Sequence, residues 1–375
     1  MCHSADWPRE GVDAKGKRTA VIGTGATGVQ LTQALAKESS SLVVFQRTPN
    51  LALPMRQSKL SREEQEDKKA NYENFFKNRE TTFSGMRYDF SGRMATAESD
   101  DEREAHFETL WKNGGFEFWV GTYSDILFDP KANRYAYDFW AKKTRARVSD
   151  TRKKDIVAPL DPPHAFGTKR PSLEEDYYDM FNRPNVDVVD IRKNPIAEIK
   201  PDGILLSDGT FYSLDVIALA TGFDAVTGSM TNMGLRDIDG KPLKEAWKDG
   251  ATSYLGMCIK GYPNMFYLYA THGPTAFSNG PSSIEIQGRW IVEVIKRILE
   301  NGWKNIQPTS RAQEEWKNKI NAVSNATLLP LTDSWYMGVN IPGKKREQLN
   351  YAGGLKQYEL EGQNALKTWD GFAVA

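Results

Sequence analysis

A glycine-rich turn between an apolar segment and a helical pattern constrains the fold more than any other feature of the sequence. Residues 19–22 form a short apolar run typical of a buried strand, and GTGATG follows at once at 23–28. A helical pattern comes next, with apolar residues at Val29, Leu31, Ala34 and Leu35. A second apolar run covers 42–45. Together these segments predict a strand–helix–strand unit of about thirty residues.

The spacing of the three glycines indicates a dinucleotide site. Gly23 allows a tight turn, Gly25 lets the backbone approach a pyrophosphate, and Gly28 lets the helix pack closely on the strand. The start of the helix offers unpaired N–H groups and a partial positive charge to phosphates. The cofactor-binding candidates of this turn are Gly23, Thr24, Gly25, Ala26, Thr27 and Gly28. The alternative is a glycine-rich turn that binds no ligand.

The residue after the second strand selects the cofactor. Sites for NAD and FAD usually place an acidic residue here, whereas this chain has Gln46-Arg47-Thr48. A guanidinium suits a ribose 2′-phosphate, through paired charge-assisted hydrogen bonds. The sequence therefore favours NADPH, with Arg47 as a solvated surface arginine being the alternative.

Composition excludes several classes of protein. The 49 basic and 49 acidic residues cancel, so nothing suggests a surface for nucleic acid or anionic membranes. No apolar run is long enough to span a bilayer, and residues 1–9 do not resemble a signal peptide. We therefore expect a cytoplasmic protein. Two cysteines and four scattered histidines predict neither a disulfide framework nor a metal site.

The rest of the chain predicts a helical insertion followed by further strands and a long helix. Residues 55–158 are rich in charge and aromatics, which favours helices with a covered aromatic face. We expect strands at 186–189, 196–199, 203–206, 216–219 and 264–270. A helix over 282–300 has Ile284, Ile291, Val294, Ile295 and Ile298 on one side. Ser282 and Glu285 suggest its capping box, and Asn301-Gly302 its end.

Five motifs in order, together with the glycine segment at 17–54, give the chain a specific resemblance. His3-x-x-x-Trp7-Pro8 resembles the end of the fingerprint FxGxxxHxxxW of Baeyer–Villiger monooxygenases, and residues 17–54 are similar to that family's NADPH-binding domain. Within the latter, VIGTGATGVQ adds Gln30 to the cofactor-binding candidates. The other matching motifs are Phe166–Pro171 (FGTKRP), Asp176–Tyr178, Ala220–Asp224 (ATGFD) and Thr332–Tyr336 (TDSWY).

The resemblance implies an α/β fold, in which a Rossmann-like NADPH domain carries a helical insertion and the C-terminal part of an FAD-binding domain follows. We expect a remnant of the FAD domain and linker at 1–8, the NADPH domain at 9–54 and 165–215, the insertion at 55–164, and the FAD-domain part at 216–375. The family begins with a separate GxGxxG unit for FAD, and this chain shows one such motif. We therefore expect a truncated product, or a partner of a separate N-terminal FAD-binding half.

The resemblance implies a reaction that uses NADPH, FAD and O₂ to insert one oxygen atom beside a ketone carbonyl, giving an ester or lactone. Such a reaction could belong to secondary metabolism. Arg170 would be the catalytic residue that stabilises developing negative charge. Lys169 and Thr48 would assist Arg47 at the 2′-phosphate. Thr221 and Gly222 would approach the flavin, and Trp335 would sit in a loop that closes over the nicotinamide. His3 would belong to the linker between domains.

Alternatives remain at each of these positions. Arg170 could simply pair with a carboxylate such as Glu174, Trp335 could be a core tryptophan, and His3 a frayed terminal residue. For the whole chain, the alternative is an inactive fragment that keeps only an NADPH-binding fold. An N-hydroxylating or sulfur-oxidising flavoenzyme is a third hypothesis, against which His3-x-x-x-Trp7-Pro8 and Lys169-Arg170 argue.

Overall fold

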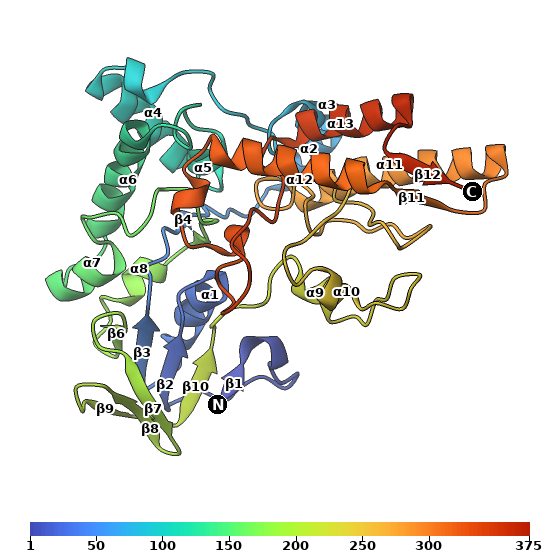
Figure 1. Ribbon diagram of the computed structural model, residues 1–375. Helices are drawn as coiled ribbons and strands as arrows, with labels where there is room; N and C mark the ends of the chain where they lie inside the picture. Colours follow the sequence, from blue (N-terminus) through green and yellow to red (C-terminus); the bar gives the residue numbers. More distant parts are fainter.

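The computed structural model describes residues 1–375 and confirms the predicted α/β class. Its centre is a five-stranded parallel sheet in the order β1-β10-β2-β3-β6, seen at the lower left of Figure 1. The strands are β1 (Cys2–His3), β2 (Arg18–Ile22), β3 (Ser41–Gln46), β6 (Val186–Asp190) and β10 (Val216–Leu219). A short 3₁₀ helix, η1 (Ser4–Asp6), follows β1.

The predicted strand–helix–strand unit is present as β2, α1 (Ala26–Leu35) and β3. β2 and β3 pair in parallel from Arg18↔Ser41 to Ile22↔Phe45, and nearly all their residues are buried, as a strand covered on both faces requires. Helix α1 buries Val29 and Leu35, whereas Ala34, which we placed on the same apolar face, is exposed.

The sheet also includes two segments that we assigned to the FAD domain. β10 lies between β1 and β2, with Val216 paired to Thr19 and Leu219 paired to both Ile22 and His3. β10, which begins at the expected boundary between residues 215 and 216, therefore pairs directly with the strand that precedes the glycine turn. Consequently Ala220 and Thr221 leave the sheet beside the glycine turn.

The predicted helical insertion occupies the segment between β3 and β6. Its charged faces are solvated, as expected, and most of its aromatics form a core with Phe107, Phe118, Trp119 and Trp140 almost fully buried. Phe76 is an exception, being half exposed. The helices are α2 (Arg62–Ala70), α3 (Tyr72–Thr81), η2 (Ala95–Ala97), α4 (Asp100–Asn113), α5 (Glu117–Val120), α6 (Pro130–Arg145) and α7 (Thr151–Val157).

A buried ion pair joins the insertion to the segment that returns to the sheet. The carboxylate of Glu174, which is almost fully buried, accepts from Arg147 at 2.5 Å, and Arg147 also pairs with Asp179. Losing Arg147 would leave the buried Glu174 carboxylate without a compensating charge. Glu174 lies on β5 (Leu173–Glu174), which pairs with β4 (Leu53–Pro54), and α8 (Tyr177–Met180) follows.

A small antiparallel sheet connects β6 to β10. It contains β7 (Ile196–Lys200), β8 (Gly203–Leu206) and β9 (Phe211–Ser213), in the order β7-β8-β9. The strands predicted at 196–199 and 203–206 are thus confirmed, with the turn at 207–210 between β8 and β9.

The C-terminal part is mostly helical, and its long helices α11, α12 and α13 lie at the upper right of Figure 1. Its elements are α9 (Gly228–Thr231), α10 (Leu243–Ala246), α11 (Gly280–Asn301), β11 (Ile306–Pro308), α12 (Ser310–Asn325), η3 (Leu329–Leu331), η4 (Trp335–Met337), α13 (Leu355–Thr368) and β12 (Phe372–Val374). β11 and β12 form an antiparallel pair. No helix in the structure combines the length and the apolar character needed to cross a membrane.

Helix α11 confirms the long helix predicted here, but its details differ. Asn279, not Ser282, is the N-cap, and its side chain accepts from the Ser282 amide because Pro281 opens the helix. Gly302, in a left-handed conformation, ends it as expected. The buried face carries Ile286, Trp290 and Val294, whereas Ile284 and Ile295 are exposed.

The strand predicted at 264–270 does not form. Asn264 and Tyr269 have left-handed backbones, with φ of 59° and 52°. The amides of Asn264, Tyr267 and Tyr269 donate to three different segments, at Ile306, Met257 and Gln287. A strand needs one continuous neighbour, and this apolar segment has none.

Candidate functional site

The glycine turn holds helix α1 at the carboxyl edge of the sheet. A Cβ atom on Gly28 would lie 2.0 Å from the Gly23 carbonyl oxygen, and one on Gly23 would lie 2.4 Å from that of Ala220. Gly23 also has φ +103°, a conformation that favours glycine. These contacts bring the helix, β2 and the end of β10 together without intervening side chains.

Gly25 differs from the other two glycines because it faces open space. A Cβ atom there would meet nothing within 4 Å, and Gly25, Ala26 and Gln30 are exposed at the start of α1. Thr27 is half-buried and Thr24 is buried. The unpaired N–H groups at the N-terminus of α1 can therefore be reached by an anion.

Two polar side chains that the sequence analysis did not single out, Asn50 and Ser172, help to hold the glycine turn in place through hydrogen bonds. The Thr24 hydroxyl donates to the Thr48 carbonyl at 2.6 Å. The Asn50 amide donates to the Thr24 carbonyl at 2.9 Å and to the Ser172 hydroxyl at 2.8 Å. Asn50 lies in the stretch 17–54 that resembles the NADPH-binding domain and Ser172 follows the FGTKRP motif, but only the fold shows that their side chains contact each other and the turn.

Two cations lie beside the turn without a partner in the chain. Arg47 is exposed immediately after β3, and Lys169 is half-buried; neither side chain makes an ion pair or a hydrogen bond. Burial lowers the pKa of Lys169, and the positive charge of Arg47 lowers it further. The geometry therefore brings two of the predicted phosphate ligands close together, and the Thr48 hydroxyl lies unpaired next to Arg47.

Arg170 does not pair with Glu174, which is occupied by Arg147. Its Nη1 donates to the Ala276 carbonyl at 3.1 Å, and its guanidinium carbon lies 5.1 Å from the Phe116 ring centre and 5.8 Å from that of Trp119. These are cation–π distances. The half-buried guanidinium has no carboxylate partner in the chain, so its remaining donors are available to an external anion.

The loop that carries Lys169 and Arg170 is held on both sides. Phe166 exchanges hydrogen bonds with the Asn133 side chain, and the Trp119 indole donates to the Gly167 carbonyl at 3.2 Å. The Thr168 hydroxyl bonds that of Thr332 at 2.7 Å. The insertion and the C-terminal segment together therefore orient two successive cations.

The Thr332–Tyr336 segment packs on this same loop. Trp335 is half-buried and packs against the main hydrophobic core, with its ring centre 4.4 Å from that of Tyr336. Tyr336 packs in turn on Phe277, which contacts Trp119. The pKa of Asp333 is lowered chiefly by Arg346, and also by Lys169 and Arg47, which places the segment within reach of the cation pair.

Thr221 and Gly222 are exposed beyond the end of β10, and Gly222 has φ +100°. The Thr221 hydroxyl lies 3.5 Å from His3 Nε2, and the His3 ring packs edge-on against Phe223. His3 is therefore an ordered member of β1 rather than a frayed residue.

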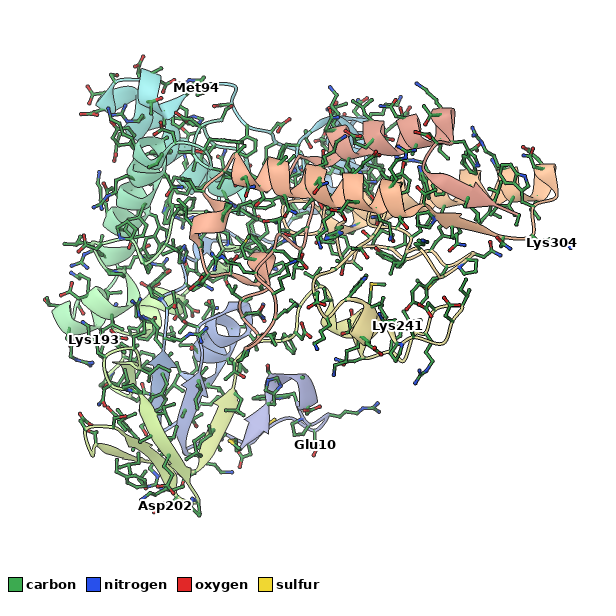
Figure 2. The ribbon with its side chains drawn as sticks, viewed as in Figure 1. Glu10, Met94, Lys193, Asp202, Lys241 and Lys304 are labelled. Carbon is green, nitrogen blue, oxygen red and sulfur yellow. The ribbon has the colours of Figure 1, made fainter.

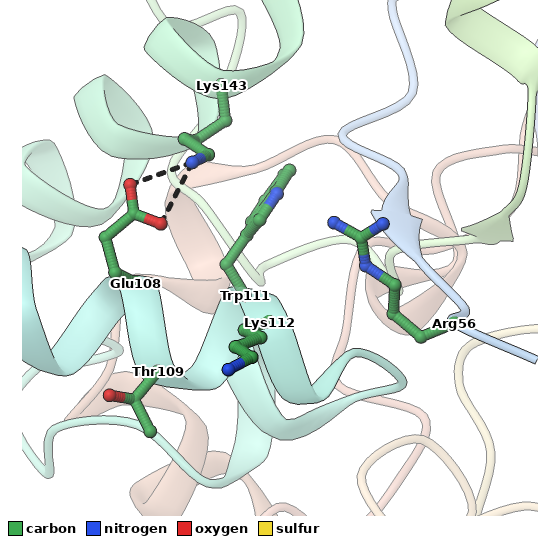
Figure 3. Close-up of a pocket in the computed structure, with 6 residues that line it drawn as sticks. All are labelled: Arg56, Glu108, Thr109, Trp111, Lys112 and Lys143. Atoms are coloured by element: carbon green, nitrogen blue, oxygen red, sulfur yellow. Dashed lines mark hydrogen bonds and ion pairs between the residues drawn. The ribbon is translucent and has the colours of Figure 1, made fainter.

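A surface pocket of about 360 Å³ lies on the insertion and contains none of the predicted site residues (Figure 3). It is lined by Arg56, Glu108, Thr109, Trp111, Lys112 and Lys143. Lys143 pairs with Glu108 across it, as the dashed lines show. No group of His, Cys, Asp or Glu side chains is arranged to hold a metal ion.

Comparison with known proteins shows which family this chain belongs to. The chain is 48% identical over 372 residues to the FAD-binding monooxygenase acrE of Aspergillus aculeatus, covering 99% of this chain and 63% of that protein. It is 43% identical to cyclopentanone 1,2-monooxygenase of Comamonas sp., covering 100% of this chain and 68% of that protein. It is also 37% identical to a Baeyer–Villiger monooxygenase of Pseudooceanicola batsensis, covering 96% of this chain and 65% of that protein. The chain belongs to the Baeyer–Villiger monooxygenase family.

Solved structures agree with this assignment. The structure of OTEMO in complex with FAD and NADP superposes with a TM-score of 0.94 at 36% identity, covering 100% of this chain and 70% of that one. No protein-family model matches the chain. The chain thus spans about two thirds of the length of these Baeyer–Villiger relatives.

The close contact at Gly28 can be tested by a paired substitution. Helix propensity favours alanine over glycine by about 1 kcal/mol. Nevertheless, we expect Gly28→Ala to lower the free energy of unfolding by about 1–3 kcal/mol, because the added methyl meets backbone. Gly25→Ala is the control: open space surrounds it, and because Gly25 is the N-cap of α1 the substitution should cost only about 0.5–1 kcal/mol. Urea denaturation of both variants measures this, and equal stabilities would contradict the packing role.

Proposed function

We propose that the chain is the NADPH-binding and arginine-bearing part of a flavin-dependent monooxygenase that inserts one oxygen atom of O₂ beside a ketone carbonyl, giving an ester or lactone. The observation that carries the proposal is the pair of adjacent cations at 169 and 170, both without a carboxylate partner, on a loop beside the glycine turn. The names of the relatives support the reaction class.

The residues present fit NADPH. The open N-terminus of α1, at Gly25, Ala26, Thr27 and Gln30, would receive the pyrophosphate. Arg47, Lys169 and the Thr48 hydroxyl would hold the ribose 2′-phosphate. A dianion would offset the repulsion between the two cations, which adds to the effect of burial in lowering the pKa of Lys169. The solved relative contains NADP, which agrees with this choice.

The residues present also fit one side of a flavin. Bound FAD would supply electron transfer from NADPH and the activation of O₂. Thr221 and Gly222 are exposed beyond β10 and would contact it through backbone atoms. The Arg170 guanidinium, preoriented by Phe116, Trp119 and the Ala276 carbonyl, would stabilise the negative charge that develops during oxygen transfer.

The Thr332–Tyr336 segment would exclude water from this site. Trp335 is half-buried beside Tyr336, and Thr332 is bonded to the loop that carries Arg170. A segment tied to the catalytic loop can shield the reacting groups from solvent. Trp335 would then cover the nicotinamide and the ketone.

The domain assignment is part of the proposal. Residues 9–54 and 165–215 would form the NADPH domain, 55–164 the insertion that orients Arg170, and 216–375 together with 1–8 the part nearest the flavin. Since the chain shows one GxGxxG unit, we propose that a separate N-terminal FAD-binding half completes the flavin site.

Arg47→Ala tests the cofactor assignment. We expect NADPH affinity to fall about 10- to 100-fold, because one charge-assisted contact to the 2′-phosphate is lost. NADH affinity should change little, since NADH lacks that phosphate. Isothermal titration with both cofactors measures the difference. Equal losses of affinity for NADPH and NADH would contradict the assignment of Arg47 to the ribose 2′-phosphate.

Arg170→Ala tests the catalytic assignment in the flavin-loaded enzyme. Ketone oxygenation should fall about 100-fold or more, since one preoriented positive charge is removed from the reacting centre. NADPH affinity should stay near that of the parent protein. Arg170→Lys, which keeps the charge but not the planar fork, should recover only part of the rate. Ester formation at the parent rate in Arg170→Ala would overturn the assignment.

A further inference from the structure

The carbonyl that holds Arg170 belongs to a turn just before α11. The Arg170 guanidinium makes one hydrogen bond in the chain, from Nη1 to the Ala276 carbonyl at 3.1 Å. Ala276 is fully buried, although it belongs to neither a helix nor a strand. A backbone carbonyl can orient a guanidinium only if its own position is fixed. The contacts that hold residues 275–278 therefore determine how firmly Arg170 is oriented.

The hydroxyl of Tyr269 connects the two sides of this turn. It donates to the Thr275 carbonyl at 2.9 Å and lies 3.5 Å from the Ser278 carbonyl, so it contacts carbonyls on both sides of Ala276. The phenol ring packs on Gly280, where an added Cβ atom would lie 3.3 Å from the ring. A side chain at Gly280 would press on the ring. The Tyr269 hydroxyl is thus placed to set the direction of the Ala276 carbonyl.

Tyr269 is itself held in a conformation that tyrosine adopts rarely, with a left-handed φ of 52°. Its amide donates at 2.9 Å to the side chain of Gln287, which is fully buried on α11. Gln287 donates in turn to the Tyr358 hydroxyl at 2.8 Å, and that hydroxyl donates to the Leu255 carbonyl at 2.6 Å. A strained backbone persists only where its surroundings over-determine it, and such residues cluster at functional sites.

The start of α11 is anchored to the insertion. Lys304, labelled at the right-hand edge of Figure 2, follows the outer end of this helix. At the opposite end, the Asn279 amide donates to the Ser84 carbonyl at 2.7 Å, and the Ser282 hydroxyl donates to the Gly85 carbonyl at 3.0 Å. The turn before α11 and the insertion that stacks on the guanidinium are therefore fixed relative to each other.

The Tyr269 phenol also lies near the guanidinium. Burial raises the pKa of Tyr269, while the positive charge of Arg170 acts in the opposite direction. Because the pKa stays raised, the phenol remains protonated at neutral pH and donates to the turn instead of neutralising Arg170. Tyr336 is also near Arg170, but its buried hydroxyl has no hydrogen-bond partner and so cannot fix the turn.

We propose that Tyr269 is a positioning residue for Arg170: its hydroxyl fixes the turn at 275–278, and the turn holds the guanidinium against the aromatic rings of the insertion with its other donors free. The inference rests on the proposed function, since it treats Arg170 as the group that stabilises charge during oxygen transfer. A neutral donor suits this role, because a carboxylate at the same place would pair with Arg170 and occupy those donors.

Site-specific labelling of Arg170 in the full chain tests the positioning without flavin. Phenylglyoxal reacts with arginine side chains, and mass spectrometry of the labelled peptides gives the rate at Arg170 alone. Tyr269→Phe keeps the ring and removes the hydroxyl. It should raise the labelling rate about 3- to 10-fold, the change in population that the loss of one hydrogen bond allows. Gly280→Ala, whose methyl would press on the phenol, should also raise the rate.

Tyr267→Phe is the matched control. It removes, from the same segment of the chain, a hydroxyl that donates to the Thr271 carbonyl at 3.3 Å. Labelling at Arg170 should then stay at the parent rate. In the flavin-loaded enzyme, Tyr269→Phe should lower kcat for ester formation about 3- to 10-fold and leave KM for NADPH unchanged, whereas Tyr267→Phe should keep the parent kcat.

Two results would overturn the inference in distinguishable ways. If Tyr269→Phe and Tyr267→Phe lose the same stability in urea and both label Arg170 at the parent rate, the Tyr269 hydroxyl serves only the fold, and the proposed function stands. If Tyr269→Phe speeds labelling but Arg170→Ala still forms ester at the parent rate, Tyr269 orients an arginine that takes no part in the reaction, and the proposed function fails.

Discussion

The structure depends on one close approach of backbone to backbone, between Gly28 on helix α1 and the Gly23 carbonyl at the end of β2. Because no side chain fits between them, the helix begins at the carboxyl edge of the sheet and directs its unpaired N–H groups there. Gly23 makes a second close approach to Ala220, which brings the end of β10 to the same point. The elements that carry the phosphate ligands and the proposed flavin contacts are positioned relative to this junction.

The second organising element is the Phe166–Pro171 loop, whose two cations have different surroundings. Lys169 shares its environment with Arg47, whereas Arg170 lies against Phe116 and Trp119 of the insertion. The insertion therefore orients the guanidinium by aromatic packing and by the bond from Trp119 to Gly167, without neutralising it. A carboxylate partner within the chain would have satisfied Arg170 and removed its charge from the site. Glu174, the nearest acidic residue in sequence, is held instead by Arg147.

Local sequence patterns predicted the local structure well and the long-range contacts poorly. The glycine unit was predictable because its strands and helix are adjacent in the chain and strongly patterned. The strand proposed at 264–270 was wrong because an apolar run alone does not supply a neighbouring strand, and the cap proposed at Ser282 was wrong because Pro281 and Asn279 already open the helix. The contacts of Arg170 with Phe116 and Ala276 span more than fifty residues in each direction, so spacing could not reveal them.

The central claim is that positive side chains at the carboxyl edge of the sheet hold the 2′-phosphate of a dinucleotide laid over the glycine turn. A crystal structure of this chain with NADP⁺ tests the claim most directly. We predict the pyrophosphate at the N-terminus of α1 and the 2′-phosphate within about 4 Å of the Arg47 and Lys169 nitrogens. A dinucleotide bound elsewhere, or one whose 2′-phosphate points into solvent away from these side chains, would contradict it.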